Sequence, residues 1–265
     1  MSERAEKQRP WKLSEVTLRD VRGMDPGYEV AVLPVGSTEP HNYHLPYGTD
    51  FMTVEKIGEE GCRRAWEEGA RVVLLPTVPY GLNWNLIKFP MTINVRSTTH
   101  AALLRDVVRS LEAHGIRKLV ILNGHGGNEF KAMVRDMCAE TDSFIGVVDW
   151  WKCAPDRARE VFEREGEHAG EMETSVFMAL HPLPVRLEQA DDGTVRTPRL
   201  RALADGRLWI TRPWHLLTKC SGHGDPALSS AEKGRRFTDA AVEELSSLLV
   251  ELSAAEMDET FPYER

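Results

Sequence analysis

The feature that most constrains the fold of this chain is the alternation of short apolar runs with longer helical stretches. The apolar runs predict four strands, at residues 28–35, 71–75, 118–122 and 144–148. Helical periodicity and capping signals predict helices at 14–21, 50–68, 98–114, 128–140, 158–164, 171–180 and 229–255. Such an alternation favours an α/β fold with a mainly parallel sheet and helices on both of its faces.

Two segments interrupt the alternation. Residues 77–97 show no regular periodicity and contain Pro79, Gly81 and Pro90, and loops of that length are usually functional. Residues 182–212 combine Pro, Gly and Asp with short β-like pieces, which predict a hairpin or an arm used in oligomerisation. Neither segment has the composition of a linker, so residues 1–265 are predicted to form a single domain.

Charge and composition narrow the class of partner. The formal net charge of −8 argues against nucleic acid or an anionic membrane as the main partner. The four cysteines form no CxxC pair, which indicates a reduced intracellular protein. Residues 1–12 have no apolar stretch typical of a signal peptide, and no apolar run approaches the ~20 residues of a membrane span. We therefore expect a cytoplasmic protein that acts on a small molecule.

A first polar cluster follows the first predicted strand, where ligand sites collect in α/β proteins. Glu39 and His41 are two residues apart, so an extended backbone would point both side chains the same way. Asp50 begins the next predicted helix and could fold back over them. Carboxylates mixed with imidazole bind divalent metals, although a solvated loop explains this cluster equally well on its own. His44 is predicted either to orient a ligand or to lie exposed in the loop.

A second cluster, Asn-Gly-His-Gly-Gly-Asn at residues 123–128, joins a predicted strand to a predicted helix. Its glycines allow the backbone to approach a ligand closely, but their spacing matches no phosphate-binding motif. His125 is therefore predicted to be a metal ligand. Asn128 is predicted to cap the following helix or to contact substrate.

A third cluster lies around the start of the predicted helix 171–180. His168 and Glu173 are both predicted to be functional, whereas Glu171 suits the simpler role of an acidic residue that favours the helix dipole. Trp150 and Trp151 end the last predicted strand. They are expected to be core or wall aromatics, with substrate stacking by one of them as the alternative.

Together these clusters resemble the motifs of the creatininase (creatinine amidohydrolase) family. The resemblance covers about residues 28–237, and its further landmarks are Phe-Pro-Met-Thr at 89–92, Gly-His-Gly-Asp-Pro at 222–226 and Glu-Lys-Gly at 232–234. It implies a three-layer αβα sandwich and a homo-oligomer, often a hexamer. It also implies two divalent metal ions per chain (zinc, manganese or iron) and hydrolysis of a non-standard C–N amide bond. The substrate would be a cyclic amide, a formamide or a small peptide-like molecule.

The resemblance also implies how the metal ligands are shared. Glu39, Asp50 and His125 would hold one ion, and His41 and Asp50 would hold the other, so that Asp50 bridges the two. A hydroxide between the ions would attack the amide carbonyl. His168 is predicted to deliver a proton to the leaving nitrogen.

Several positions depart from the usual family sequence. Gly127 stands where creatininase itself has a metal-binding glutamate, and Glu173 is our candidate replacement for that ligand and for its part in catalysis. The other departures, at residues 40, 42, 43 and 83–86, lie where substrate would bind, which argues against creatinine itself. Asn83, Asn128 and Trp150 are the predicted substrate contacts. A metal-assisted isomerase and a catalytically silent homologue are the alternatives to an amidohydrolase.

Overall fold

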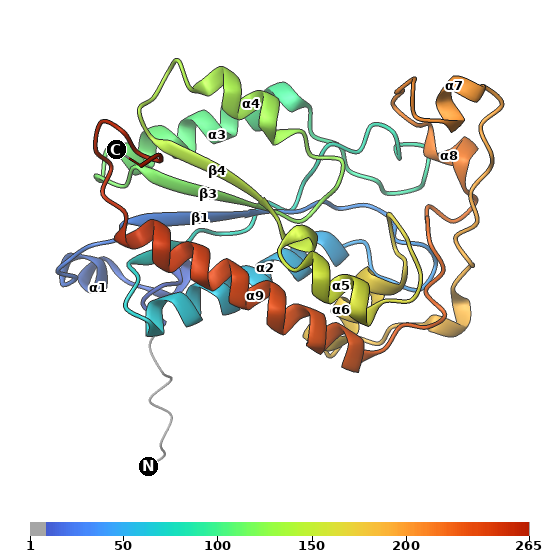
Figure 1. The fold of residues 1–265 in the computed structure, drawn as a ribbon, viewed down its shortest axis with the longest axis horizontal. Coiled ribbons are helices and arrows are strands. Elements are labelled where there is room, and N and C mark those ends of the chain that lie inside the picture. The colour runs from blue at the N-terminus through green and yellow to red at the C-terminus, as the bar shows by residue number, and fades with distance from the viewer. Residues whose placement is uncertain (1–8, 265) are drawn as a thin grey trace, which may run out of the picture.

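A four-stranded parallel sheet forms the centre of the computed structural model, which describes residues 9–264 (Figure 1). Its strands are β1 (Val30–Val35), β2 (Val72–Leu74), β3 (Lys118–Asn123) and β4 (Phe144–Asp149). The spatial order is β2-β1-β3-β4, and every neighbouring pair is parallel. Each predicted apolar run matches one of these strands to within two residues at either end.

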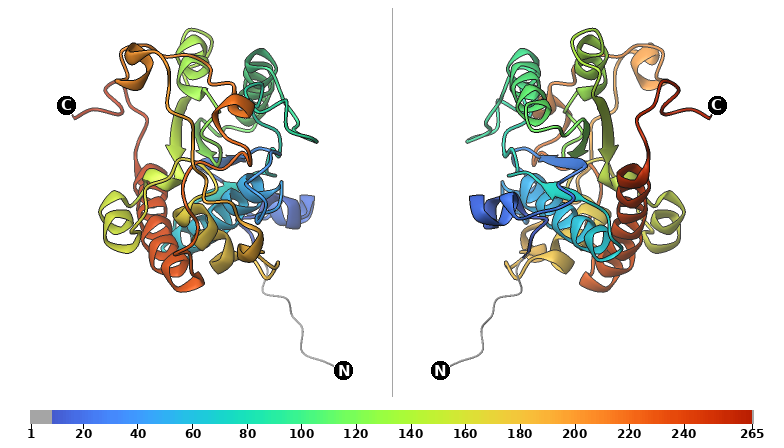
Figure 2. Two further views of the ribbon diagram at one scale, coloured as in Figure 1. Left: turned by 90° about the vertical axis from the view of Figure 1, so that its right-hand side faces the viewer. Right: turned by 90° about the vertical axis from the view of Figure 1, so that its left-hand side faces the viewer.

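Helices cover both faces of the sheet, as Figure 2 shows from the two ends. One face carries α2 (Thr49–Glu67), α5 (Pro155–Val161), α6 (Glu171–Leu180) and α9 (Ala231–Ala254), and the other carries α3 (Ser97–Glu112) and α4 (Phe130–Met137). Side chains alternate along β1, so Val30 and Val32 join the core beneath α2 and α9, while Ala31 and Leu33 join the core beneath α3 and α4. Both cores are apolar, as expected for a parallel sheet buried on both faces. The predicted three-layer αβα fold is confirmed.

Local signals set several helix ends as predicted. Gly69 after α2 and Gly115 after α3 have φ values of +97° and +79°, a left-handed conformation that glycine adopts without strain. At the start of α9 the Ser230 side chain accepts a hydrogen bond from the backbone N–H of Lys233. These helices therefore begin and end close to the predicted residues.

The predicted helix at 14–21 is wrong in its start. The chain instead forms a 3₁₀ turn (Leu13–Glu15) and a short helix α1 (Leu18–Arg22). Thr17 and Asp20 form a capping box, in which each side chain accepts a hydrogen bond from the other's backbone, so the helix begins after Thr17. Helix α5 likewise begins earlier than predicted, at Pro155, whose ring suits the first turn of a helix.

The predicted hairpin in 182–212 is also wrong, because none of these described residues forms a strand. The segment contains a 3₁₀ turn (Leu187–Gln189) and helix α7 (Arg201–Ala204), and it leads to helix α8 (Trp214–Leu217). In Figure 1 this gold and orange segment lies beyond the carboxyl ends of the strands. Its Pro and Gly residues break both periodicities, which leaves mostly irregular structure.

The register of the sheet brings the ends of three strands together. Val35 of β1 is level with Asn123 of β3, and Asn123 is level with Asp149 of β4. The polar clusters that follow these strands therefore emerge at one edge of the sheet, as the topology predicts. Among the described residues no helix is long and apolar enough to cross a membrane.

Candidate metal centre

The loop after β1 and the first turn of α2 bring three predicted ligands together. Glu39 and His41 are fully buried, and Asp50 is 3% exposed. A Cβ atom on Gly36 would lie 2.4 Å from the backbone of Phe51, so the start of α2 touches the end of β1 directly. Because of this close approach, Asp50 in the first turn of α2 lies beside Glu39 and His41 of the preceding loop.

His125 completes the arrangement from the neighbouring strand. Its Nδ1 lies 2.9 Å from Glu39 Oε1 and 3.0 Å from Asp50 Oδ2. His41 approaches Asp50 from the other side, with Nε2 2.9 Å from Oδ1 and 3.7 Å from Oε1 of Glu173. The two oxygens of Asp50 thus face two different histidines, which is the position that a bridging carboxylate needs.

The outer nitrogen of each of three histidines lies against a backbone carbonyl. These contacts are His41 Nδ1 to Glu39 O at 3.1 Å, His125 Nε2 to Leu82 O at 3.3 Å, and His168 Nε2 to Pro40 O at 3.0 Å. A carbonyl only accepts hydrogen bonds, so the outer nitrogen carries the proton and the inner nitrogen of a neutral ring presents its lone pair. Metal-binding histidines are usually oriented in this way.

The inward-facing atoms fit divalent cations. Both carboxylate oxygens of Glu39, and Oδ2 of Asp50, are buried without a hydrogen bond among the described residues. Buried oxygens of this kind are costly unless a cation or a donor meets them. The lone pair of a neutral imidazole and a carboxylate oxygen repel each other. A cation between them would replace this repulsion with two attractive contacts. The donor set of carboxylates and imidazoles also suits zinc, manganese or iron.

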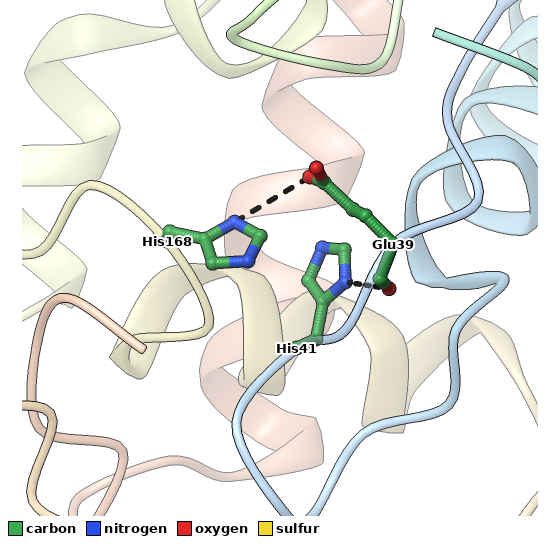
Figure 3. Close-up of side chains that lie close together, drawn as sticks. All are labelled: Glu39, His41 and His168. Atoms are coloured by element: carbon green, nitrogen blue, oxygen red, sulfur yellow. Dashed lines mark hydrogen bonds and ion pairs between the residues drawn. The ribbon is translucent and has the colours of Figure 1, made fainter. Parts of the chain in front are cut away.

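Three overlapping groups of ligand atoms lie close enough to share an ion. The atoms within each group are at most 4.8 Å apart, and the groups are Glu39/Asp50/His125, His41/Asp50/Glu173 and Glu39/His41/His168. The first two match the predicted sets, with Glu173 completing the second. Figure 3 shows the third group, in which the rings of His41 and His168 lie beside the Glu39 side chain. The structure therefore brings all the predicted metal residues together.

The charges of these groups shift their pKa values strongly. Burial lowers the pKa of His41, but Asp50 and Glu173 outweigh it and raise the pKa well above the usual value. The pKa of His125 is raised in the same way by Glu39 and Asp50. Burial raises the pKa of Asp50 and of Glu173, yet the neighbouring imidazoles lower both values. The centre thus holds ionised carboxylates that attract cations, and metal ions would compete with protons for the imidazoles.

His44 is buried rather than exposed, so the exposed-loop alternative is wrong. Its Nε2 lies 2.9 Å from the hydroxyl of Thr174, the residue after Glu173 on α6. Burial, together with the charge of His41, lowers the pKa of His44 to about 4. The neutral His44 ring therefore links the loop that carries Glu39 and His41 to α6.

The structure does not bring the two predicted asparagine contacts to the substrate cavity. Asn83 is fully buried, and its amide donates hydrogen bonds to Ser37 Oγ at 2.5 Å and to the Ile93 carbonyl at 2.8 Å. Asn128 accepts from the Leu82 backbone at 3.2 Å and donates to Asn123 Oδ1 at 3.1 Å. The predicted cap at Asn128 is also wrong, because α4 begins after residue 129 without a side-chain cap. Both side chains brace loops around the centre.

A cavity of about 910 Å³ opens onto the centre, with Glu39, Asp50, His125, His168 and Glu173 along its wall. Trp150 lines it and is 2% exposed, as expected of a wall aromatic, and its contact with substrate stays a prediction. Arg212 and Trp214 are among the further lining residues that the sequence did not single out. The Trp214 ring packs edge-on against His168 with 5.3 Å between centroids, and the Arg212 guanidinium lies 5.3 Å from that ring.

One sequence signal points to these missed residues. The landmark at 222–226 lies a few residues after Trp214, and its His223 pairs with His168 through backbone hydrogen bonds of 2.8 and 3.1 Å. This pairing brings the segment that carries Arg212 and Trp214 to the cavity. Figure 2, left, views the molecule from that edge.

A buried group of imidazoles and carboxylates at the carboxyl edge of a parallel sheet defines the chain as an α/β protein with a candidate metal centre. The family model for creatininase, described as creatinine amidohydrolase, matches residues 14–249. The chain therefore belongs to the creatininase family, which confirms the predicted family. The predicted enzyme class, a hydrolase of carbon–nitrogen bonds other than ordinary peptide bonds, is confirmed at the level of the family.

Individual relatives are similar over most of their length. The mycofactocin precursor peptide peptidase of Mycobacterium tuberculosis is 30% identical over 223 residues, which are 80% of this chain and 81% of the relative. The creatinine amidohydrolase of Pseudomonas putida is 29% identical over 184 residues, 62% of this chain and 68% of the relative.

A solved structure from Bacteroides fragilis, provisionally named a creatinine amidohydrolase, has a TM-score of 0.87 and 39% identity over 94% of this chain and 98% of that one. The manganese form of creatininase shares the fold, with a TM-score of 0.77 at 22% identity, over 92% of this chain and 99% of that one.

Proposed function

We propose that the chain is a hydrolase that uses two divalent metal ions to cleave a non-standard C–N amide bond in a small molecule. The observation that carries the proposal is the pair of ligand groups that share Asp50. Each group contains a buried histidine whose outer nitrogen is held by a backbone carbonyl. When bound, such ions would polarise the amide carbonyl and lower the pKa of a water molecule between them.

The ligands of the first ion would be Glu39, Asp50 and His125, and those of the second would be His41, Asp50 and Glu173. The surroundings of Gly127 support Glu173 as the replacement ligand. A Cβ atom at Gly127 would lie 2.4 Å from His125 Nε2, so no side chain fits there without moving that ring. Glu173 instead supplies a carboxylate from α6, where its Oε1 lies 3.7 Å from His41 Nε2.

His168 is the residue proposed to move a proton. Its Nε2 is occupied by the Pro40 carbonyl at 3.0 Å, whereas Nδ1 lies 3.8 Å from Glu39 Oε1 and 3.9 Å from Glu173 Oε2. His168 also lines the cavity. Nδ1 is therefore the atom positioned to take up a proton and to pass it to the leaving nitrogen of a bound amide.

The size of the cavity supports a substrate larger than creatinine. Cavities of about 300–1,000 Å³ usually hold drug-sized ligands, and this one has a volume of about 910 Å³. Its aromatic and basic side chains could contact an extended molecule; they are Trp150, Trp151, Phe162, Trp214, Arg159 and Arg212. Similarity to proteins named as a precursor peptide peptidase and as a formylamino-pyrimidine deformylase favours a peptide-like or formamide substrate.

The proposal also includes a cytoplasmic homo-oligomer. Large exposed apolar side chains at Trp84, Met91 and Trp209, each more than 70% exposed, support a contact with a second copy. Light scattering coupled to gel filtration would measure the mass, and a monomer at micromolar concentration would contradict this part of the proposal.

The first test is metal content per chain, measured by elemental analysis on protein purified without added metal. About two zinc, manganese or iron ions per chain are expected, followed by hydrolysis of cyclic amides, formamides or short peptides in a substrate panel. Protein that neither contains metal nor takes it up on incubation would contradict the proposal. Metal-loaded protein that turns over no amide would favour the silent homologue, and conversion without C–N cleavage would favour the isomerase.

A further inference from the structure

Glu171, the first residue of α6, is a buried carboxylate outside the proposed ligand sets. Its side chain is 0% exposed. Oε2 accepts hydrogen bonds from the backbone N–H groups of Glu163 at 2.9 Å and Arg164 at 2.7 Å, and Oε1 lies 2.5 Å from Lys233 Nζ. A charge that merely favours the helix dipole would stay in solvent and would need none of these partners.

Lys233 occupies a position that its own helix disfavours. It lies in the first turn of α9, where a cation meets the positive end of the helix dipole. Its ammonium group pairs with Glu171 and also with Glu163 at 2.8 Å. The next residue is Gly234, where a Cβ atom would lie 1.9 Å from the Ser175 carbonyl oxygen, so α9 and α6 touch backbone to backbone. This contact holds Lys233 beside Glu171.

The backbone that Glu171 holds belongs to one wall of the cavity. Residues 162–170, here called the wall loop, connect α5 to α6, line the cavity and carry His168. The carboxyl-terminal end of the wall loop is tied to the 222–226 segment by the backbone pair between His168 and His223. Gly166 also packs there, since a Cβ atom on it would lie 3.1 Å from the Gly224 Cα. At the amino-terminal end, the Glu171 carboxylate accepts the two backbone hydrogen bonds, and the Arg164 guanidinium pairs with Asp225 at 2.5 Å.

We propose that Glu171, neutralised by Lys233, is a positioning residue that fixes the wall loop and thereby holds His168 against the metal ligands. The inference rests on the proposed function for the role of His168. In Glu171→Gln an NH₂ donor replaces one carboxylate oxygen, so the side chain can no longer accept from both Lys233 and the loop, and its neutral oxygen is a weaker acceptor for the N–H groups of Glu163 and Arg164. The loop is then held mainly by its pairing with His223 and by the ion pair between Arg164 and Asp225. The His168 ring then moves relative to Glu39 and Glu173, while the ligand sets remain complete.

The test compares Glu171→Gln, Lys233→Met and the charge-conserving Lys233→Arg in the whole 265-residue chain loaded with metal. The matched control is Glu232→Gln. Glu232 directly precedes Lys233, and its exposed carboxylate pairs with Arg235. Amide hydrogen exchange is measured by mass spectrometry on peptides that cover 162–170, together with metal content and with kinetics on a panel amide that the wild type cleaves.

Glu171→Gln is expected to speed exchange in the wall loop but not in α2, with metal content unchanged. Since displacement of a reacting group by about 1 Å can cost on the order of 100-fold in rate, kcat should fall about 100-fold while KM changes little. Lys233→Met should act in the same direction, Lys233→Arg should restore protection and turnover, and the control should match the wild type. If Glu171→Gln does not fold, Lys233→Met carries the same comparison.

Unchanged exchange in the wall loop would overturn the inference, and so would faster exchange with an unchanged kcat. Loss of metal from Glu171→Gln would overturn it too, since the residue would then act on the ligands themselves. Failure of the proposed function looks different, because the wild type itself would then take up no metal or would cleave no amide on the panel.

Discussion

The cavity is bounded by two regions that reach it in different ways. The rim, residues 36–50 and 124–128, directly follows β1 and β3, which are neighbours in the sheet. The wall, residues 162–170 and 212–224, follows no strand directly and is joined by a backbone pair between His168 and His223. Sheet topology therefore places the rim, whereas contacts between distant segments place the wall. We expect metal binding to depend chiefly on the rim, and turnover without metal loss to depend on the wall.

The largest effect is expected at the centre of the rim. His125→Ala removes a nitrogen 2.9 Å from Glu39 and 3.0 Å from Asp50, so bound metal should fall by about one ion per chain. Turnover should fall by about 1,000-fold, in the range found when a main electrostatic stabiliser is lost. Elemental analysis and panel kinetics check this, with His114→Ala at an exposed position as the control. Unchanged metal content would remove His125 from the ligand set.

Glu173→Gln tests whether a residue outside the rim also holds metal. Glu173 lies on α6, and its Oε1 is 3.7 Å from His41 Nε2. We expect one of the two sites to weaken or empty and turnover to fall about 100-fold. Glu165→Gln, an exposed carboxylate on the same cavity, should retain both ions. Full occupancy of both sites with normal activity would show that Glu173 does not replace the ligand missing at Gly127.

A smaller effect is expected in the wall. Trp214→Ala removes the ring that packs on His168, and an aromatic contact of this kind is worth about 1 kcal/mol, or roughly fivefold in rate or KM. Metal content should stay at the wild-type value. Tyr263→Ala, at an aromatic position that is 81% exposed, is the matched control. Loss of metal from Trp214→Ala would break the distinction between rim and wall.

The smallest effect concerns His181, which ends α6 outside both regions. Burial, helped by the charge of Lys56, lowers its pKa to about 4. The folded protein thus keeps this ring neutral, while the unfolded chain binds a proton below about pH 6.5, so stability is lost as the pH falls from about 6.5 toward 4. Because the ring is only partly buried, His181→Leu should reduce that loss by about 1 kcal/mol.

Urea unfolding of metal-free protein at pH 7 and pH 5 measures this difference. His114→Leu, at an exposed position, is the matched control for the loss of an imidazole. An identical loss in His181→Leu and the wild type would show that His181 does not contribute to it.

Residues near the strands show how far local pattern carries. The apolar runs predicted the four strands, and the polar residues after them predicted the ligand-rich edge, because strand direction and side-chain alternation are local properties. Asn128 shows the limit: its local context suits a helix cap, yet its amide bonds Asn123 and the Leu82 backbone. An asparagine that caps a helix and one that holds a loop have the same local sequence pattern, so only the path of the neighbouring loop distinguishes the two roles.

The sequence by itself therefore determined the α/β class, the order of strands and helices, the family and the residues available to hold metal. The tertiary structure alone decided that Glu173 reaches His41, that Arg212 and Trp214 line the cavity, and that Glu171 meets Lys233. The physical reason is range. Periodicity, capping and strand-end chemistry act over a few residues, whereas these contacts join segments up to 132 positions apart. Only the packing of α6 and α9 on one face of the sheet, and the path of the segment that leads to α8, bring them together.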